Sequence, residues 1–258
     1  MKKNIPMFTI PETHPRCKSL LKREKIVAGI EAGITSRQGL IAHGRGEAFD
    51  YLIGERTLPA AMKATEAAAA LMLTAERPVI SVNGNVAALV PEKVVELGEL
   101  LNIPLEVNIF YWTEERVIRI KEHLEQHGAR NVLGDKADAR IPGLEHARAR
   151  VAKDGIYSAD VVLAPLEDGD RCEALIAMGK KVISIDLNPL SRTSKHATVS
   201  IVDELERVLK NLISMVKADT KSEREREQLV EMFDNEANLR AVIKEIDDRL
   251  KEEELVEF

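Results

Sequence analysis

Residues 36–47 combine cationic side chains with glycines in a way that suits the binding of small anions. Arg37 and Arg45 each carry a guanidinium that can grip phosphate oxygens through paired hydrogen bonds, and the glycines near them let the backbone approach a ligand. The alternative is an ordinary surface loop with a helix that starts at Glu47. Because Arg16 adds positive charge a short distance upstream, we interpret the run as an anion clamp.

A second polar cluster follows an apolar run at 79–82. The run is typical of a buried strand, and it ends in Asn83, Gly84 and Asn85, whose amides and free N–H groups would emerge at the carboxyl edge of a sheet. Open α/β sheets bind their ligands at that edge. A simple turn explains the same residues, because glycine between asparagines suits one. We favour a binding role, with Asn85 as the candidate.

A third cluster follows the apolar run at 181–185. Asp186 and Asn188 lie directly after it, and Arg192 and Thr193 follow a few residues later. An acidic residue at the end of a strand can accept hydrogen bonds from a ribose or a base. A turn closed by the Asp side chain and the proline after Asn188 is the alternative. Since the loop holds more polar residues than a turn needs, we predict a nucleotide site.

An acidic group at 167–170 also follows an apolar run. Its carboxylates can hold Mg²⁺, and they can equally cap the helix that comes after them. Familiar signatures are missing from the sequence: there is no Walker-type phosphate loop, no GxGxxG after a strand, no HExxH zinc pair and no GxSxG elbow. His123 and His127 fit the end of a helix better than a metal pair.

Short apolar runs alternate with helix-length segments through the middle of the chain. The strands predicted from these runs are 79–82, 105–109, 131–133, 160–164, 182–185 and 198–202. The predicted helices are 18–30, 58–73, 91–101, 114–126, a segment near 144–152, 171–178 and 204–217. This alternation predicts an α/β fold, Rossmann-like, with a mainly parallel sheet and helices on both faces.

We expect a single domain in three parts. Residues 1–75 form a helical N-terminal part, 76–218 the Rossmann-like core, and 219–258 an acidic C-terminal helix. Within the last part, 221–253 is predicted to be one continuous helix whose apolar seam packs on its own domain or on a twin subunit, and we expect a homodimer. The loop after the strand at 182–185 contains a proline and is too short for a crossover helix, which favours a functional role.

The bulk composition excludes several classes of protein. With 45% hydrophobic residues the chain can bury an ordinary core, and it has no membrane-length apolar run and no signal-type N-terminus, so we expect a cytoplasmic protein. The net charge of −6 arises in residues 219–258, which hold seven Lys or Arg against fourteen Asp or Glu. Aromatic residues are only 3%, and the basic surplus near the N-terminus is too scattered for a nucleic-acid groove. Cys17 and Cys172 lack metal-ligand spacing and are expected to be free thiols.

Four long segments of the sequence together resemble one protein family. They are PETHPRCKSLLKREKI, SRQGLIAHGRGEAFDYLIGE, VISVNGNVAALVPE and SIDLNPLSRTSKHATVSIVDE, and the resemblance runs the whole length of the chain. The family is that of the archaeal 4-phosphopantoate–β-alanine ligases, also called phosphopantothenate synthetases. The resemblance implies a homodimeric Rossmann-like enzyme that joins 4-phosphopantoate to β-alanine, with ATP converted to AMP and pyrophosphate, in coenzyme A synthesis.

The resemblance also implies roles for particular residues. ATP contacts carried over by motif are Arg16 and Arg37 for the phosphates, Asp186, Leu187 and Asn188 for the adenosine, and Arg192, Thr193, Ser200 and Ile201 for the rest of the nucleotide pocket. Candidates for 4-phosphopantoate, chosen by charge and position because a dianion needs cations or donors, are Arg45, Asn85, His146 and Arg148. The sequence does not indicate the Mg²⁺ ligands or a base for the amine.

The expected chemistry is an adenylation followed by an amide bond. The carboxylate of phosphopantoate attacks the α-phosphate of ATP, and the amine of β-alanine then displaces AMP, while arginines and Mg²⁺ stabilise charge. A small-molecule kinase or another adenylating ligase would use a similar cleft at the strand ends. A nucleotide-sensing dimer that uses its acidic tail as a partner surface is the non-enzymatic alternative.

Overall fold

A computed structural model describes residues 10–252 and contains one main sheet. Its six strands run in the order β3-β2-β1-β6-β7-β8, and every neighbouring pair is parallel. These strands are β1 (Pro78–Val82), β2 (Leu105–Val107), β3 (Val132–Leu133), β6 (Val161–Pro165), β7 (Lys181–Ile185) and β8 (Val199–Ile201). All six predicted strands and the α/β fold with a parallel sheet are therefore confirmed.

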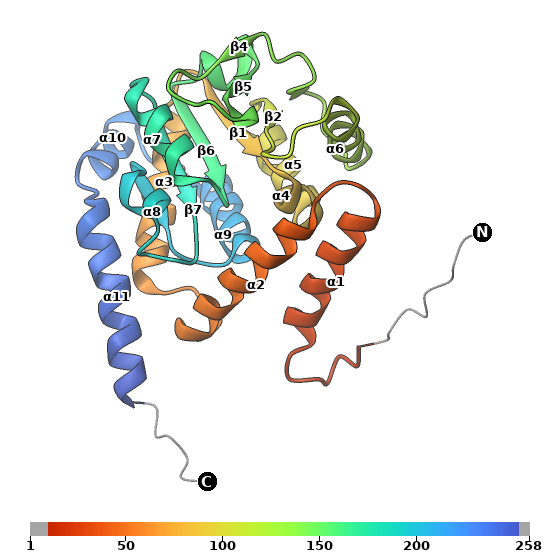
Figure 1. Cartoon of the computed structure of the whole chain (residues 1–258). Helices are drawn as coiled ribbons and strands as arrows, with labels where there is room; N and C mark the ends of the chain where they lie inside the picture. Colours follow the sequence, from red (N-terminus) through yellow and green to blue (C-terminus); the bar gives the residue numbers. More distant parts are fainter. Residues whose placement is uncertain (1–9, 253–258) are drawn as a thin grey trace.

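Helices cover both faces of this sheet (Figure 1). They are α1 (Cys17–Glu31), α2 (Arg37–Leu52), α3 (Pro59–Thr74), α4 (Gly84–Leu89), α5 (Pro91–Leu101), α6 (Glu114–Gln126), α7 (Gly169–Ala177), α8 (Arg192–His196), α9 (Leu205–Ala218), α10 (Glu223–Glu231) and α11 (Asn235–Glu252). The helices predicted at 18–30, 58–73, 91–101, 114–126, 171–178 and 204–217 are confirmed to within a few residues. Across the described residues, no helix is long and apolar enough to cross a bilayer.

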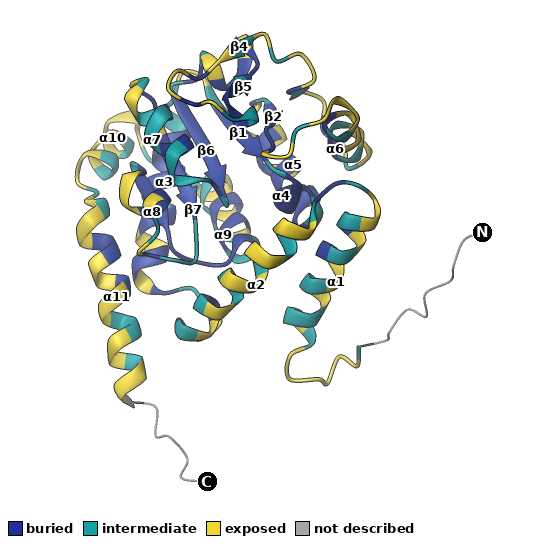
Figure 2. Ribbon diagram, viewed as in Figure 1, coloured by how far each residue is buried: buried dark blue, intermediate teal, exposed yellow. Residues whose placement is uncertain are grey.

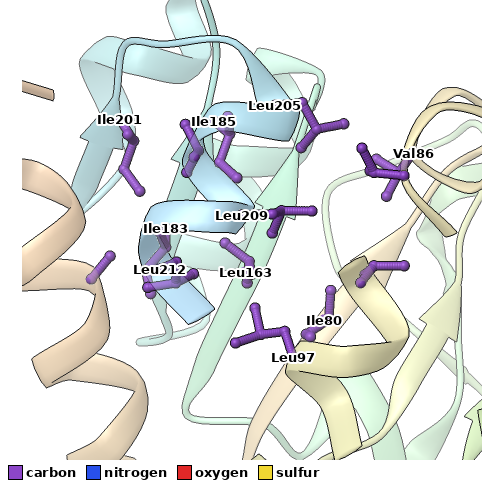
Figure 3. Packing of buried hydrophobic residues seen from close by; sticks show 14 of the residues in the cluster. Ile80, Val86, Leu97, Leu163, Ile183, Ile185, Ile201, Leu205, Leu209 and Leu212 are labelled. Carbon is purple, nitrogen blue, oxygen red and sulfur yellow. The ribbon is translucent and has the colours of Figure 1, made fainter. Parts of the chain in front are cut away.

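The protein has one hydrophobic core on each face of the sheet. Successive side chains of a strand point to opposite faces, so alternate residues of each central strand pack into different cores. Ile80, Leu163 and Ile183 join the larger core with helices α3, α5 and α9, and Figure 3 shows them packed together. Val79 and Val162 join a smaller core on the other face with α7. Because both faces are covered, the strands are almost wholly buried (Figure 2), which explains their unbroken apolar runs.

Residues 36–47 form a helix, so the predicted glycine-rich clamp loop is wrong in its conformation. Helix α2 begins directly after Ser36, whose hydroxyl accepts a hydrogen bond from Gly39 N at 3.3 Å. That cap satisfies one of the amides that a helix start leaves unpaired. Gly39 also lies against Asn85 and Thr35, so packing with the start of α4 holds a segment of weak helical preference in place.

The segment near 144–152 is not the predicted helix. It holds a short 3₁₀ turn at Ala147–Ala149, and β4 (Ala139–Arg140) pairs antiparallel with β5 (Arg150–Val151) before a π-type turn at Lys153–Tyr157. Both oxygens of buried Glu106 accept backbone hydrogen bonds here, from Ala152 N at 2.9 Å and Ile156 N at 2.6 Å. These long-range bonds override the local helical pattern.

Two further predictions about helices are corrected. The tail 221–253 is broken between α10 and α11, because Asp234 caps the second helix by accepting a hydrogen bond from Ala237 N at 3.0 Å. The loop after β7, judged too short for a crossover helix, contains the short helix α8, which Ser191 caps by accepting a hydrogen bond from Ser194 N at 3.0 Å. Cys17 and Cys172 are free thiols, as predicted.

Candidate functional site

A cavity of about 500 Å³ lies at the carboxyl ends of the parallel strands. Its walls come from α1, α2, the start of α4 and the loops that follow β2, β6, β7 and β8. Figure 1 shows α2 lying beyond the arrowheads of β1 and β6. These two strands are neighbours in the sheet, and the chain leaves them in opposite directions, towards β2 on one side and β7 on the other. Open α/β sheets bind their ligands at such a switch point.

Asn83 fixes the two strand ends that meet at the switch point. Its Nδ2 donates to Pro165 O at 2.9 Å and Leu166 O at 3.1 Å, which ties the end of β1 to the end of β6. Its Oδ1 accepts from Asn85 N at 3.0 Å and from Val86 N at 3.1 Å, which caps α4. One side chain thus positions both the strand ends and the helix start at the floor of the cavity.

Asn85 lines the cavity and joins α4 to α2. Its Nδ2 donates to Gly39 O at 2.9 Å, and its Oδ1 accepts from the Thr35 hydroxyl at 2.5 Å. The side-chain amide is therefore occupied by protein partners. The predicted cluster after β1 is therefore at the cavity. The Asn85 side chain holds the start of α2 over the strand ends.

Arg148 enters the same cavity from the segment before β5. Its Nε donates to Asn108 Oδ1 at 3.0 Å, and its Nη1 lies 2.7 Å from Glu167 Oε1 and 2.6 Å from Asp168 Oδ2. The side chains of Arg148 and Glu167 are 4% and 0% exposed. Glu167 also binds Arg171, a wholly buried guanidinium whose pKa burial lowers. One carboxylate therefore holds two buried cations beneath the cavity.

Arg116 is a second cation in the cavity wall, and no motif in the sequence singles it out. Its Nη2 donates to Ile34 O at 3.1 Å and its Nη1 to Tyr111 O at 3.2 Å. Burial lowers the pKa of Arg116. Because its hydrogen-bond partners among residues 10–252 are neutral carbonyls, no carboxylate in direct contact cancels its positive charge, and the charge is available to a bound anion.

The first and third predicted clusters meet at the cavity. Arg45 and Leu187 both line it, and Gly46 packs against Leu187, so α2 lies against the loop after β7. Burial raises the pKa of Asp186, although the charge of Arg45 opposes that effect. The Asp186 carboxylate accepts from Asn188 N at 3.0 Å and from the Ser191 hydroxyl at 2.5 Å. The turn considered as an alternative is therefore present, close to a cation of the clamp.

Asp186 and Asn188 are not part of the cavity lining, and the remaining predicted residues also lie outside it. His146 bonds Asp170 at 2.8 Å and stacks on Phe110, which itself lines the cavity. Arg16 and Arg37 are exposed, at the N-terminal ends of α1 and α2, and Arg192 is exposed and paired with Glu173 at 2.8 Å. Thr193, Ser200 and Ile201 are buried. The Thr193 hydroxyl donates to Glu167 O at 2.8 Å, and the Ser200 hydroxyl donates to Ser194 O at 2.6 Å. Their nucleotide roles stay predictions.

The wall opposite the switch point is rich in charges from α1, α2 and α9. Lys22 Nζ lies 2.8 Å from Glu204 Oε2. Glu47 accepts hydrogen bonds from Ser19, from Tyr51 at 3.0 Å and from Arg23 at 3.0 Å. His43, one turn before Glu47 on α2, lines the cavity, and burial lowers its pKa. Apart from His43 and Glu47, which lie in the predicted run at 36–47, the sequence did not mark these residues, because they converge only when three distant helices pack.

No carboxylate-rich metal centre is preformed in the described part of the chain. Within residues 10–252, no three His, Cys, Asp or Glu side chains are grouped so that they could hold an ion. Of the acidic group at 167–170, Glu167 and Asp168 bind Arg148, and Asp170 binds His146. Asp168 alone of these three lines the cavity, and its side chain is 44% exposed.

The fold and the cavity define a Rossmann-like α/β protein with a ligand site at its switch point. Residues 60–249 match the sequence model of the phosphopantothenate/pantothenate synthetase family, and the chain belongs to that family. A 4-phosphopantoate–beta-alanine ligase of Methanosarcina mazei is 56% identical over 247 residues, which cover 95% of this chain and 97% of the relative. A protein of the same name from Thermococcus kodakarensis is 52% identical over 248 residues, with 95% and 94% covered.

Proposed function

We propose that the protein is an ATP-dependent ligase that joins 4-phosphopantoate to β-alanine. The products are 4′-phosphopantothenate, AMP and pyrophosphate, in a step of coenzyme A biosynthesis. The high identity to relatives that carry this ligase name supports the proposal. The structural observation that carries it is the cavity at the switch point, where all three predicted clusters meet.

The cations around the cavity support binding of two anionic substrates. Arg45 lies beside the loop after β7 and is proposed to serve the nucleotide, while Arg148 and Arg116 lie nearer the floor and are proposed to serve phosphopantoate. Two anions repel each other, so the protein must supply opposing charge to hold them within reacting distance. The predicted ATP contacts at Arg16, Arg37, Asp186 and the loop to Ile201 belong to this proposal.

We propose an acyl adenylate as the intermediate. The carboxylate of phosphopantoate attacks the α-phosphate and expels pyrophosphate, and no covalent bond to the protein is needed. The chain aligns the two anions and holds cations where negative charge builds up. Mg²⁺ is expected to arrive on the phosphates of ATP. Asp168, the member of the acidic group at 167–170 that lines the cavity, could complete its shell, since nucleotide-borne Mg²⁺ needs one or two protein carboxylates.

The experiment is an isotope test with purified protein. Phosphopantoate labelled with ¹⁸O in its carboxylate is incubated with ATP and β-alanine, and the products are analysed by mass spectrometry. Transfer of one label into AMP supports the adenylate. Label in pyrophosphate, or in neither product, would contradict it. The expectation of a homodimer in the cytoplasm stays a prediction, and sedimentation equilibrium tests the dimer.

A further inference from the structure

His43 lies in the cavity wall, and the binding of two anions does not explain the charged residues around it. It lies on α2 and lines the cavity, and among residues 10–252 no hydrogen bond to either ring nitrogen is found. Four charged residues act on it: Glu47 from its own helix, Glu204 from the start of α9, and Lys22 and Arg23 from α1. Glu47 pairs with Arg23 and Glu204 pairs with Lys22, so this wall offers charges of both signs, which suits a zwitterion better than a phosphate.

We propose that His43 is the base that accepts a proton from the amine of the amino-acid substrate, and that Glu47 and Glu204 attract its ammonium group. The proposal rests on the proposed ligase function and names the place where the second substrate binds. A short ω-amino acid is a zwitterion, with an ammonium at one end and a carboxylate at the other. The pair formed by Lys22 and Glu204 at 2.8 Å offers one charge to each end.

The carboxylates nearby are poorer candidates for the base. Glu47 is held by donors from Ser19, Arg23 and Tyr51, and despite the opposing effect of burial its pKa is lowered. Glu204 is likewise paired with Lys22, and its pKa is lowered against the effect of burial. Both stay ionised and attract the ammonium. Burial lowers the pKa of His43, so its imidazole is neutral near pH 7 and has a lone pair for a proton.

The step balances as a simple acyl transfer. His43 takes one proton from the ammonium, which exposes the nitrogen lone pair. The nitrogen then forms a bond to the acyl carbon, while the bond from that carbon to the phosphate oxygen breaks and AMP leaves with its electron pair. The second proton lost as the amide forms goes to solvent, and imidazolium returns its proton to solvent before the next turnover.

The test compares two acceptors in a His43→Gln variant. Glutamine keeps a polar side chain but cannot accept the proton. With β-alanine, kcat/KM is expected to fall by about 100-fold or more, the range of general base catalysis. Hydroxylamine is largely uncharged at neutral pH, so it needs neither the base nor the charged pair. The rate of hydroxylamine-dependent AMP release by the variant should therefore stay within about threefold of the native rate, a much smaller loss than the one expected with β-alanine. The matched control is His127→Gln, because His127 lies at the end of α6 and outside the cavity lining.

Each outcome has a separate meaning. Unchanged kcat/KM for β-alanine in His43→Gln overturns the proposal, and so does an equal loss with both acceptors in a variant that melts like the native protein. If His43→Gln unfolds at a lower temperature than the native protein, His43→Asn is used in its place, and the dependence of kcat/KM on pH is measured. For the native protein, kcat/KM for β-alanine should fall at acid pH as His43 takes a proton. In the variant this fall at acid pH should be absent. A fall that persists in the variant overturns the proposal. Native protein that releases no AMP with either acceptor refutes the ligase function itself.

Discussion

Arg148 and Glu167 form an ion pair of 2.7 Å with both side chains buried beneath the cavity. Glu167 also binds Arg171, so this one carboxylate balances two guanidiniums at the end of β6. Charges buried this deeply are tolerated only in pairs, because each would otherwise lose its hydration without compensation. The pairing also fixes the direction in which Arg148 faces the cavity.

Replacing Glu167 by glutamine should therefore destabilise the protein strongly. The change removes the ion-pair partner of buried Arg171 and leaves Arg148 with Asp168 alone, so the free energy of unfolding should fall by about 3 kcal/mol or more. Urea denaturation measures it. The control is Glu236→Gln, which breaks an exposed pair with Arg240 on α11 and should cost less than about 0.5 kcal/mol. Similar costs for the two variants would contradict the account of the buried network.

Gly39 and Gly44 lie on the same helix but should respond in opposite ways to alanine. A Cβ on Gly39 would fall 2.6 Å from Thr35 Oγ1 and closer still to Asn85 Oδ1, whereas a Cβ on Gly44 meets nothing within 4 Å. Gly39→Ala should lower the free energy of unfolding by about 1–3 kcal/mol through overpacking. Gly44→Ala should raise it by about 0.5–1 kcal/mol, because alanine loses less entropy in a helix. Thermal or urea unfolding distinguishes the two, and a destabilising Gly44→Ala would be the unexpected result.

Glu106 should make stability depend on pH. Burial raises its pKa from 4.5 to about 7 in the folded protein. The folded state then binds more protons than the unfolded state between these values, so this contribution is full below about pH 4.5 and is lost as pH rises through 7. The Glu106→Gln variant has no side chain that titrates at this position, and it loses one of the two backbone hydrogen bonds, because glutamine has a single acceptor oxygen. The native protein should exceed the variant in stability most at pH 5, and the difference should shrink by pH 8. A difference that is constant with pH would mean that Glu106 does not titrate in this range.

Arg45 should contribute to nucleotide binding. Loss of one charge-assisted hydrogen bond to a phosphate costs about 1.5–3 kcal/mol, so Arg45→Ala should weaken ATP binding by roughly 10- to 100-fold. Isothermal titration calorimetry with Mg²⁺ and ATP measures the affinity. Arg130→Ala is the control, because that arginine is 87% exposed and lies beyond α6. Equal affinities for the two variants would remove Arg45 from the site.

The sequence predicted the sheet well because the strands are buried on both faces. Runs such as 161–165 and 182–185 leave no room for another interpretation once helices alternate with them. The turn at 139–157 was missed because Glu106, far away in the sequence, fixes it through Ala152 and Ile156. No local pattern contains that information.

The candidate site was predicted only where its residues are clustered in the sequence. Asn83 belongs to a short polar run at the end of β1 and Arg45 to one within α2, and both are at the cavity. Arg116, Lys22 and Glu204 lie among other charged residues and belong to no motif, so nothing in the sequence sets them apart. They converge only because α1 and α6 pack against α4, and such convergence is a tertiary property.

The most direct test of the ligase function is the identity of the nucleotide product. Purified protein is incubated with ATP, Mg²⁺ and β-alanine, together with either 4-phosphopantoate or unphosphorylated pantoate, and nucleotides are separated by chromatography. With 4-phosphopantoate we expect AMP and 4′-phosphopantothenate in equal amounts, and with pantoate far less product, because the cavity cations are proposed to bind the substrate phosphate. Formation of ADP in place of AMP, or AMP release that does not depend on β-alanine, would contradict it.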